Sequence, residues 1–146
     1  MEVLISVAVT AIGLLGIAGL LMVSSKVTES ASMRTQVELA AQSLIDSMRT
    51  NSVATLAGDY EGTLSTAAMD STDCAAQKCS AKARSAYERR RFARSLAAVS
   101  PDAKASVGCA ASGTEQVCRL VVQLPERKLS YTNSVENRAM AWVFVP

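Results

Sequence analysis

The sequence predicts an α+β protein with a long N-terminal helix, a second and shorter helix, and a small antiparallel sheet. Three observations predict this class. An uncharged apolar run opens the chain and continues into an amphipathic helical pattern that reaches residue 49. A second helical pattern covers residues 80–99, and the residues after it alternate between apolar and polar, as strands do. Such elements are expected to form layers, with the sheet packed on the long helix.

The apolar run, residues 3–23, contains no charged side chain. About 20 apolar residues span a bilayer as a helix, whereas a cleaved signal peptide has a basic start and a shorter core. We therefore expect a membrane helix. Glu2 precedes the run, and a carboxylate beside an apolar stretch is costly unless a cation pairs with it. Three glycines in the run would let another helix approach closely: Gly13, Gly16 and Gly19.

The helical pattern continues through residues 24–49, which contain neither Gly nor Pro. Apolar residues recur there at spacings of three and four, on one face of a helix: Val37, Ala41, Leu44 and Met48. We expect this helix to end just before Asn51. Because the apolar repeat is shorter than four heptads, a coiled-coil stalk is disfavoured. We expect one end of the helix to be buried in lipid or partner proteins and the other to pack on a small domain.

The segment that follows should connect the long helix to the rest of the head. Residues 51–73 are rich in Ser, Thr, Ala and Gly, and residues 58–62 have the composition of a turn. Ser80 is a suitable N-cap for the second helix, which Pro101 should end.

The last third of the chain predicts strands. Residues 105–110 and 116–124 are expected to form a hairpin whose second strand ends at Pro125. Three large side chains alternate in a final strand: Met140, Trp142 and Phe144. A small antiparallel sheet packed on the upper half of the long helix follows from this pattern.

Four cysteines lie in the head: Cys74, Cys79, Cys109 and Cys118. Zinc ligands are usually separated by two residues, and redox pairs form Cys-x-x-Cys motifs. Here four residues separate the first two cysteines and eight separate the last two, which disfavours both a zinc site and a redox pair. We expect two disulfides, and three pairings are possible. We favour Cys109–Cys118, because these residues lie on the two arms of the predicted hairpin, together with Cys74–Cys79.

Composition and motifs disfavour several classes of function. A hydrophobic content of 49% and a mean hydropathy of +0.20 are too apolar for a disordered chain. The chain has no His, which removes the commonest general base and metal ligand. It also has neither a nucleophile elbow nor a phosphate-binding glycine loop. We therefore expect a protein that is not an enzyme, with no catalytic residue, metal or cofactor.

The second helix is strongly basic. Its arginines form a candidate contact patch for DNA or for an acidic partner subunit: Arg84, Arg89, Arg90, Arg91 and Arg94. The alternative is a solvated helix face whose arginine stems cover apolar surface. The net charge of +2 gives little general attraction to nucleic acid, and we favour the solvated face.

The N-terminal residues resemble a known family. Glu2-Val-Leu-Ile-Ser-Val, followed by Ile12-Gly-Leu-Leu-Gly-Ile-Ala-Gly-Leu, is similar to the N-terminal helix of class III-signal pilins, in which Thr-Leu-Ile-Glu-Val-Leu opens the mature chain. Together with Ser47-Met48-Arg49-Thr50-Asn51, these residues most resemble the PilV family of minor pilins. The likeness is strong over the first fifty residues. It is weaker through residues 58–60, 73–74, 79–80 and 87–96.

One departure from the family pattern is plain. Met1 stands where the motif has Ile, and the basic leader, the Gly cleavage site and the first Phe of the mature chain do not precede it in this sequence. We therefore expect the chain to begin after such a leader, through truncation, trimming or a late start codon.

The resemblance implies a type IV pilin-like fold with three parts. Residues 1–25 would form the transmembrane and filament-core helix, residues 26–50 its amphipathic continuation, and residues 51–146 a periplasmic α+β head. Glu2 would meet the N-terminal amine of a neighbouring subunit in the filament, where a buried carboxylate needs such a partner. The three glycines would belong to the same filament core.

The function implied is that of a minor pilin of a bacterial type IV pilus. Such a subunit joins other minor pilins in the complex that primes pilus assembly and sits at the filament tip, in contact with the major pilin and with an adhesin. It would reside in the inner membrane before it reaches the pilus and the cell surface, where pili support twitching motility and adhesion. The alternatives are a type II secretion pseudopilin, a pilus-associated subunit for DNA uptake or adhesion, and a single-pass sensor without a filament role.

Overall fold

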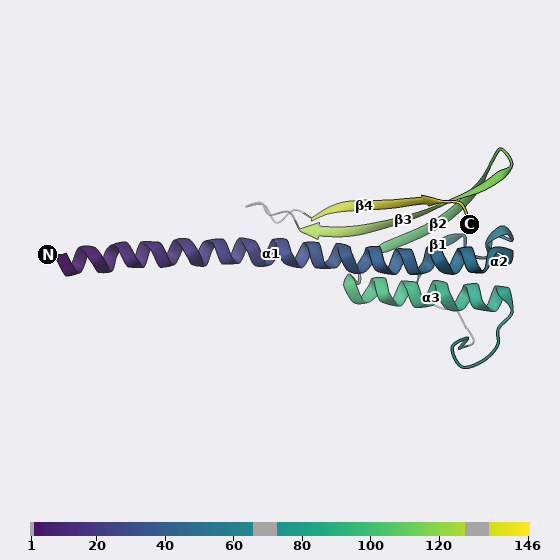
Figure 1. The fold of residues 1–146 in the computed structure, drawn as a ribbon, viewed down its shortest axis with the longest axis horizontal. Coiled ribbons are helices and arrows are strands. Elements are labelled where there is room, and N and C mark those ends of the chain that lie inside the picture. The colour runs from purple at the N-terminus through teal and green to yellow at the C-terminus, as the bar shows by residue number, and fades with distance from the viewer. Residues whose placement is uncertain (1, 66–72, 128–134) are drawn as a thin grey trace. The chain divides into compact units, whose positions relative to one another are not determined.

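The structure is a computed structural model that describes residues 2–65, 73–127 and 135–146. Three helices and four strands occur in this part of the chain (Figure 1). In chain order they are α1 (Glu2–Thr50), α2 (Ser52–Leu56), β1 (Gly62–Leu64), α3 (Ala81–Val99), β2 (Lys104–Ser112), β3 (Glu115–Arg127) and β4 (Val135–Phe144). The protein is therefore α+β, with a long N-terminal helix, a shorter helix and an antiparallel sheet, which confirms the predicted class.

The chain divides into two compact units, Met1–Thr35 and Gln36–Pro146. The first unit consists of the N-terminal part of α1. Its hydroxyl side chains return their hydrogen bonds to the preceding helical turn: Ser6 Oγ donates to the carbonyl of Val3 at 2.9 Å, and Thr10 Oγ1 donates to the carbonyl of Ser6 at 2.9 Å. These hydroxyls therefore do not interrupt the apolar surface with unsatisfied polar groups.

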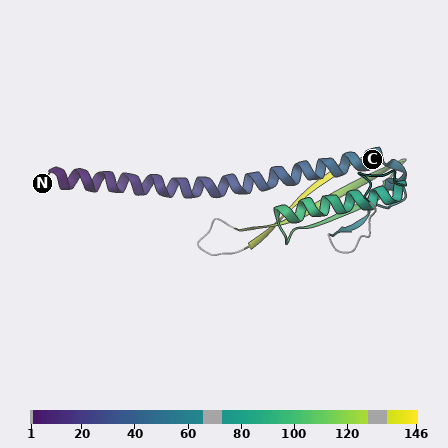
Figure 2. The same ribbon diagram turned by 90° about the horizontal axis from the view of Figure 1, so that it is seen from below.

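The second unit contains the sheet, α3 and the last turns of α1. The strands pair in the order β1-β2-β3-β4, and every neighbouring pair is antiparallel. Within this unit, α3 and the last turns of α1 lie side by side over the same face of the sheet (Figures 1 and 2). This arrangement is a two-layer domain in which one face of the sheet is covered by helices.

The core lies between the sheet and the two helices. Five residues of α1 are buried in it: Val37, Ala41, Leu44, Ile45 and Met48. The sheet contributes alternate residues of β3, Cys118, Leu120, Val122 and Leu124, while α3 contributes Phe92 and Leu96. The helical face predicted from the spacing of apolar residues is therefore confirmed. These turns of α1 form core, and the second compact unit, which begins at Gln36, includes them.

The second helix agrees with its predicted bounds. Ser80 is the N-cap of α3, and its side chain accepts a hydrogen bond from the backbone N–H of Ala83 at 3.3 Å. The helix ends at Val99, before Pro101. Met140 and Trp142 are partly buried against the core and Phe144 is buried, so the three alternating side chains of the predicted last strand face the core.

The prediction that Pro125 ends its strand is wrong, because β3 continues to Arg127 and Pro125 pairs with Asn137 of β4. The Cα atoms of Cys109 and Cys118 are 4.0 Å apart, as expected of a non-hydrogen-bonded pair between β2 and β3. In such a pair the backbone N–H of Cys118 points away from β2, and the direction alternates along the strand. The N–H groups of odd-numbered residues of β3 therefore point toward β2. No residue of β2 pairs with position 125, since the β2–β3 pairing stops at Lys104↔Gln123, so a proline that lacks this N–H is tolerated.

Two short elements were not expected in the connecting segment. Helix α2 follows α1 after one residue, and the buried Thr55 ties the two together because its Oγ1 donates to the carbonyl of Met48 at 2.8 Å. Strand β1 then pairs with β2 over three residues, from Gly62↔Val107 to Leu64↔Ala105. Gly62, with a φ of 101°, provides the turn into this strand.

Candidate functional site

The first candidate feature is the uncovered apolar run of α1. Its large apolar side chains between Val3 and Val23 are 55–74% exposed, and none is buried. Among the described residues, α1 is the one helix long and apolar enough to cross a membrane. A core helix of similar composition would be covered by its own chain. The described residues do not cover this segment, which is compatible with a single-pass membrane anchor.

The residues expected in a filament core lie on this segment without intramolecular contacts that would explain them. Glu2 is exposed in the first turn of α1. A Cβ added at Gly13, Gly16 or Gly19 would meet no atom within 4 Å. The glycines therefore do not serve close packing inside the described chain. Their role in helix association, and the pairing of Glu2 with a neighbouring amine, stay predictions.

The second feature is the way the head holds the last turns of α1. The indole Nε1 of Trp142 in β4 donates to both carboxylate oxygens of Glu38, at 3.0 and 3.1 Å. Glu38 also accepts from Gln42 Nε2 at 3.0 Å. In the sequence Glu38 belongs to the polar side of the helix, and in the structure this half-buried carboxylate satisfies a half-buried indole.

A buried polar cluster joins the end of α1 to α3. Asn51 Nδ2 donates to the carbonyl of Ala81 at 2.9 Å and to Tyr60 Oη at 3.2 Å. Tyr60 is fully buried, and its hydroxyl donates to Glu88 Oε2. The other oxygen of Glu88 accepts from Arg84 Nε at 3.0 Å. The cluster connects three segments that are distant in the sequence, and both oxygens of the buried carboxylate have partners.

The electrostatics of this cluster favour a neutral phenol. Burial raises the pKa of Tyr60 well above its ordinary range, and the hydrogen bond to the Glu88 carboxylate raises it further. Ionisation would place a second negative charge against Glu88 in a desolvated site. The arrangement fixes Tyr60 as a permanent hydrogen-bond donor at neutral pH, which suits a structural role.

Arg89 is half-buried, and its guanidinium is held by backbone carbonyls of the segment around β1. Its Nη1 donates to the carbonyl of Asp59 and its Nη2 to the carbonyl of Thr63, both at 3.3 Å. Its Nε is buried without a hydrogen-bond partner among the described residues. Desolvation lowers the pKa of this guanidinium from its usual value. Arg89 therefore fixes the turn before β1 against α3.

The structure separates the five arginines that the sequence groups into one patch. Arg84 and Arg91 are two helical turns apart, on one face of α3, and both line a hollow beside the Cys74–Cys79 loop. Arg89 points instead toward β1. Arg90 is half-buried, and Arg94 is exposed but lines neither of the two principal hollows of the described chain.

Both disulfides that the sequence favours are present in the structure. Cys74 pairs with Cys79, and Cys109 pairs with Cys118. The second bridge joins opposite residues of β2 and β3, at the position given by the strand register. The first closes a short loop directly before the N-cap of α3. Among the described residues, no group of three or more His, Cys, Asp or Glu is placed to hold a metal ion.

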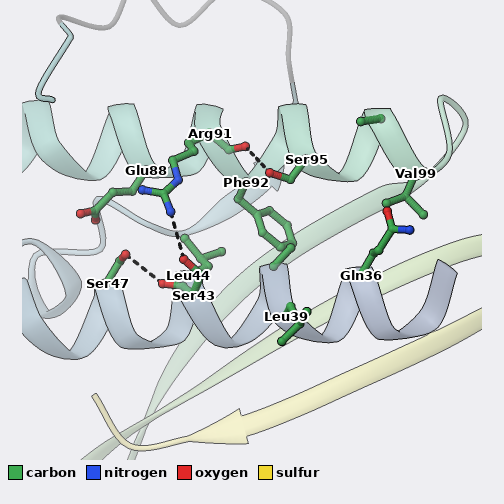
Figure 3. A pocket seen from close by; sticks show the side chains of 12 residues that line it. Gln36, Leu39, Ser43, Leu44, Ser47, Glu88, Arg91, Phe92, Ser95 and Val99 are labelled. Atoms are coloured by element: carbon green, nitrogen blue, oxygen red, sulfur yellow. Dashed lines mark hydrogen bonds between the residues drawn. The ribbon is translucent and has the colours of Figure 1, made fainter. Parts of the chain in front are cut away.

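A groove of about 460 Å³ runs between α1 and α3 (Figure 3). Its α1 wall includes Leu39 and Ser43, and its α3 wall includes Phe92 and Ser95. Arg91 crosses it, since its Nη2 donates to Ser43 Oγ at 3.4 Å. The groove is lined by hydroxyl side chains, such as Ser43 and Ser95, and by apolar ones, such as Leu39 and Phe92.

Sequence reasoning missed the residues of the polar cluster. Asn51 was interpreted as a helix terminator and Tyr60 as part of a turn, and neither pattern indicates a buried contact. One signal was available for Glu88, which is the single acid in a helix with six basic residues. An acid among basic residues is expected to pair with one of them, as Glu88 does with Arg84, so this signal does not indicate the buried contact with Tyr60.

Comparisons with protein-family models, with curated proteins and with solved structures found no significant match for this chain.

Proposed function

We propose that this protein is a minor pilin, a structural subunit of a bacterial type IV pilus that is held in the inner membrane before assembly. The observation that supports this proposal most directly is the uncovered apolar run of α1, in a helix whose last turns form part of the head's core. A helix of this kind needs an apolar environment at one end and belongs to a folded domain at the other. A filament built from bundled helices requires both properties.

The mechanism in this proposal is transfer between two apolar environments. Residues 3–23 lie in lipid before assembly and among the helices of other subunits afterwards. Burial of the run, at about 25 cal/mol per Å² of apolar surface, stabilises either state similarly, so the transfer carries little net hydrophobic cost. In the filament, Glu2 would pair with the N-terminal amine of a neighbouring subunit, because a carboxylate among apolar helices needs a cation.

The head is proposed to face the periplasm. Its two disulfides support this placement, because such bonds persist in the oxidising compartments outside the cytoplasm. The resemblance to PilV-type minor pilins supports a role in the complex that primes assembly and sits at the tip. The partners would then be other minor pilins, the major pilin and a tip adhesin.

The test is made in the bacterium that carries this gene. The gene is deleted and then restored with a C-terminally tagged full chain, and the sheared pilus fraction is probed beside the inner-membrane fraction. We expect the tagged chain in both fractions, with pili and twitching motility lost in the deletion and restored by the chain. Glu2→Gln should reduce incorporation into sheared pili, while Glu29→Gln, an exposed acid on the same helix, should not.

The same strains distinguish the other assignments. If pili are normal but protein secretion fails in the deletion strain, the chain is a pseudopilin and the pilus proposal is wrong. If the chain stays in the membrane fraction and neither pili nor secretion changes, it has no filament role.

A further inference from the structure

A hollow of about 700 Å³ lies between the Cys74–Cys79 loop and α3. Three cationic side chains line it: Lys78 from the loop, and Arg84 and Arg91 from the helix. The disulfide closes the loop that carries Lys78, and Tyr87 lies in the same wall between the two arginines. The hollow therefore brings three positive charges together, on a helix and on a loop that a disulfide constrains. All of its residues belong to the Gln36–Pro146 unit.

These cations retain donor groups for a ligand. Arg84 uses its Nε for Glu88, and no other partner occurs for it among the described residues. Its side chain is 59% exposed, so its two terminal nitrogens can reach a group in the hollow. Arg91 has one long contact, 3.4 Å to Ser43 Oγ, and Lys78 is exposed with no partner in the described part of the chain.

The acid in the hollow does not cancel this charge. Glu88 is 8% exposed, and its two oxygens are bound to Tyr60 and Arg84. Its effect is to hold Arg84 in position. Residues 73–99 carry seven basic and two acidic side chains, whereas the whole chain has a net charge of +2, so the rest of the chain is net negative by three. Positive charge is thus concentrated on this part of the head.

We propose that this hollow binds the phosphodiester backbone of DNA. Arg84 and Arg91 are seven helical residues apart, which is about 10.5 Å along the axis. A DNA strand carries one phosphate for about every 3.4 Å of its axis, so the two arginines are separated by about three phosphate repeats. Guanidinium groups bind phosphate oxygens in bidentate geometry, and Lys78 supplies a third point charge.

The layout favours a phosphodiester over an acidic protein segment. The volume of about 700 Å³ admits a ligand with several charged groups. The cations also follow one straight helix face and the adjoining loop, which suits a ligand whose charges repeat along a line. This site does not depend on the proposed pilus role, because it lies in the head and its binding is measured without filaments.

The experiment uses the full chain in mild detergent with a short fluorescent DNA duplex, and measures affinity by anisotropy at several salt concentrations. Three phosphate contacts predict that affinity falls about 40-fold between about 50 and 200 mM salt. Lys78→Gln or Arg91→Gln should each reduce this fall to about 12-fold and weaken binding. Lys82→Gln and Arg94→Gln are matched controls, since both residues are exposed and neither lines the hollow; their affinity and salt dependence should be those of the wild type.

Three outcomes overturn the proposal. The first is no binding of the duplex at low salt by a chain whose tryptophan fluorescence shows a folded head. The second is equal weakening by the control variants, which would indicate a diffuse attraction to the whole basic helix. The third is competition by polyglutamate as effective, charge for charge, as competition by unlabelled DNA, which would assign the hollow to an acidic protein partner.

Discussion

Replacement of Tyr60 by Phe tests whether the buried polar cluster holds the head together. Tyr60 is fully buried, its hydroxyl donates to Glu88 and it accepts from Asn51 at 3.2 Å. The Phe variant keeps the ring but removes the donor, which leaves one oxygen of a buried carboxylate without its partner. Hydrogen bonds to charged groups contribute about 1.5–3 kcal/mol. We expect the free energy of unfolding to fall by about that amount.

The assay is denaturant unfolding of the full chain in detergent, followed by the fluorescence of Trp142, the single tryptophan of the protein. Tyr87→Phe is the matched control, because no hydrogen bond of its hydroxyl is present among the described residues and Tyr87 is half-buried. We expect this control to change stability by less than about 0.5 kcal/mol. In a Glu88→Gln background, Tyr60→Phe should cost much less, since the charged acceptor is already absent.

The pKa shift of Tyr60 adds a dependence on pH. Its pKa is raised in the folded state, so the neutral phenol is favoured there and its contribution is fully present below the ordinary value of about 10. As the pH rises above 10, the unfolded chain loses this proton first and the contribution disappears. The stability gap between the wild type and Tyr60→Phe should therefore shrink above pH 10. Equal stability of the Tyr60 and Tyr87 variants at neutral pH would refute this account of the cluster.

Three further predictions concern packing, covalent bonds and the N-terminal helix. Leu44→Ala should lower the free energy of unfolding by about 2–5 kcal/mol, because Leu44 is 3% exposed. Leu39→Ala on the same helix should be close to neutral, because Leu39 is 62% exposed, and denaturant titration of both variants measures the difference. Replacement of Cys109 and Cys118 by Ser should cost about 2–3 kcal/mol from the entropy of the closed loop, and unchanged thermal unfolding after this replacement would contradict it. Gly16→Leu should leave the helix of the isolated chain intact by circular dichroism, since nothing lies within 4 Å of an added Cβ, but should reduce recovery in sheared pili if the helix packs closely on its neighbours.

The elements predicted correctly were those with a long and regular pattern. The spacing of apolar residues from Val37 to Met48 identified the buried face of α1, and Ser80 with Pro101 bounded α3. Strand β1 and helix α2 have three and five residues, which is too short for a period to be recognised. The prediction for Pro125 is wrong because the effect of a missing N–H depends on whether a strand pairs on that side. The order and length of the neighbouring strands decide this, and the sequence of β3 alone does not indicate them.

The candidate sites divide in the same manner. The apolar run and the hairpin disulfide depend on local spacing, and both were visible in the sequence. The polar cluster brings Asn51 and Tyr60 together with Glu88, residues that no periodicity relates, and only the packed chain makes them neighbours. The arginines illustrate the converse, since residues only two positions apart in the sequence, such as Arg89 and Arg91, face different surroundings once the helix is formed.

The bridge between Cys109 and Cys118 has a consequence for how the head reaches its final state. A slip of one residue between β2 and β3 would turn one of these cysteines to the opposite face of the sheet, because successive side chains alternate. A slip of two would move their Cα atoms too far apart for a bond. Oxidation can therefore capture only the hairpin whose pairing is correct over its whole length from Lys104↔Gln123 to Ser112↔Glu115. The disulfide therefore fixes the correct strand register once it has formed. Chains with misaligned strands do not form this bond, and their strands can still change register.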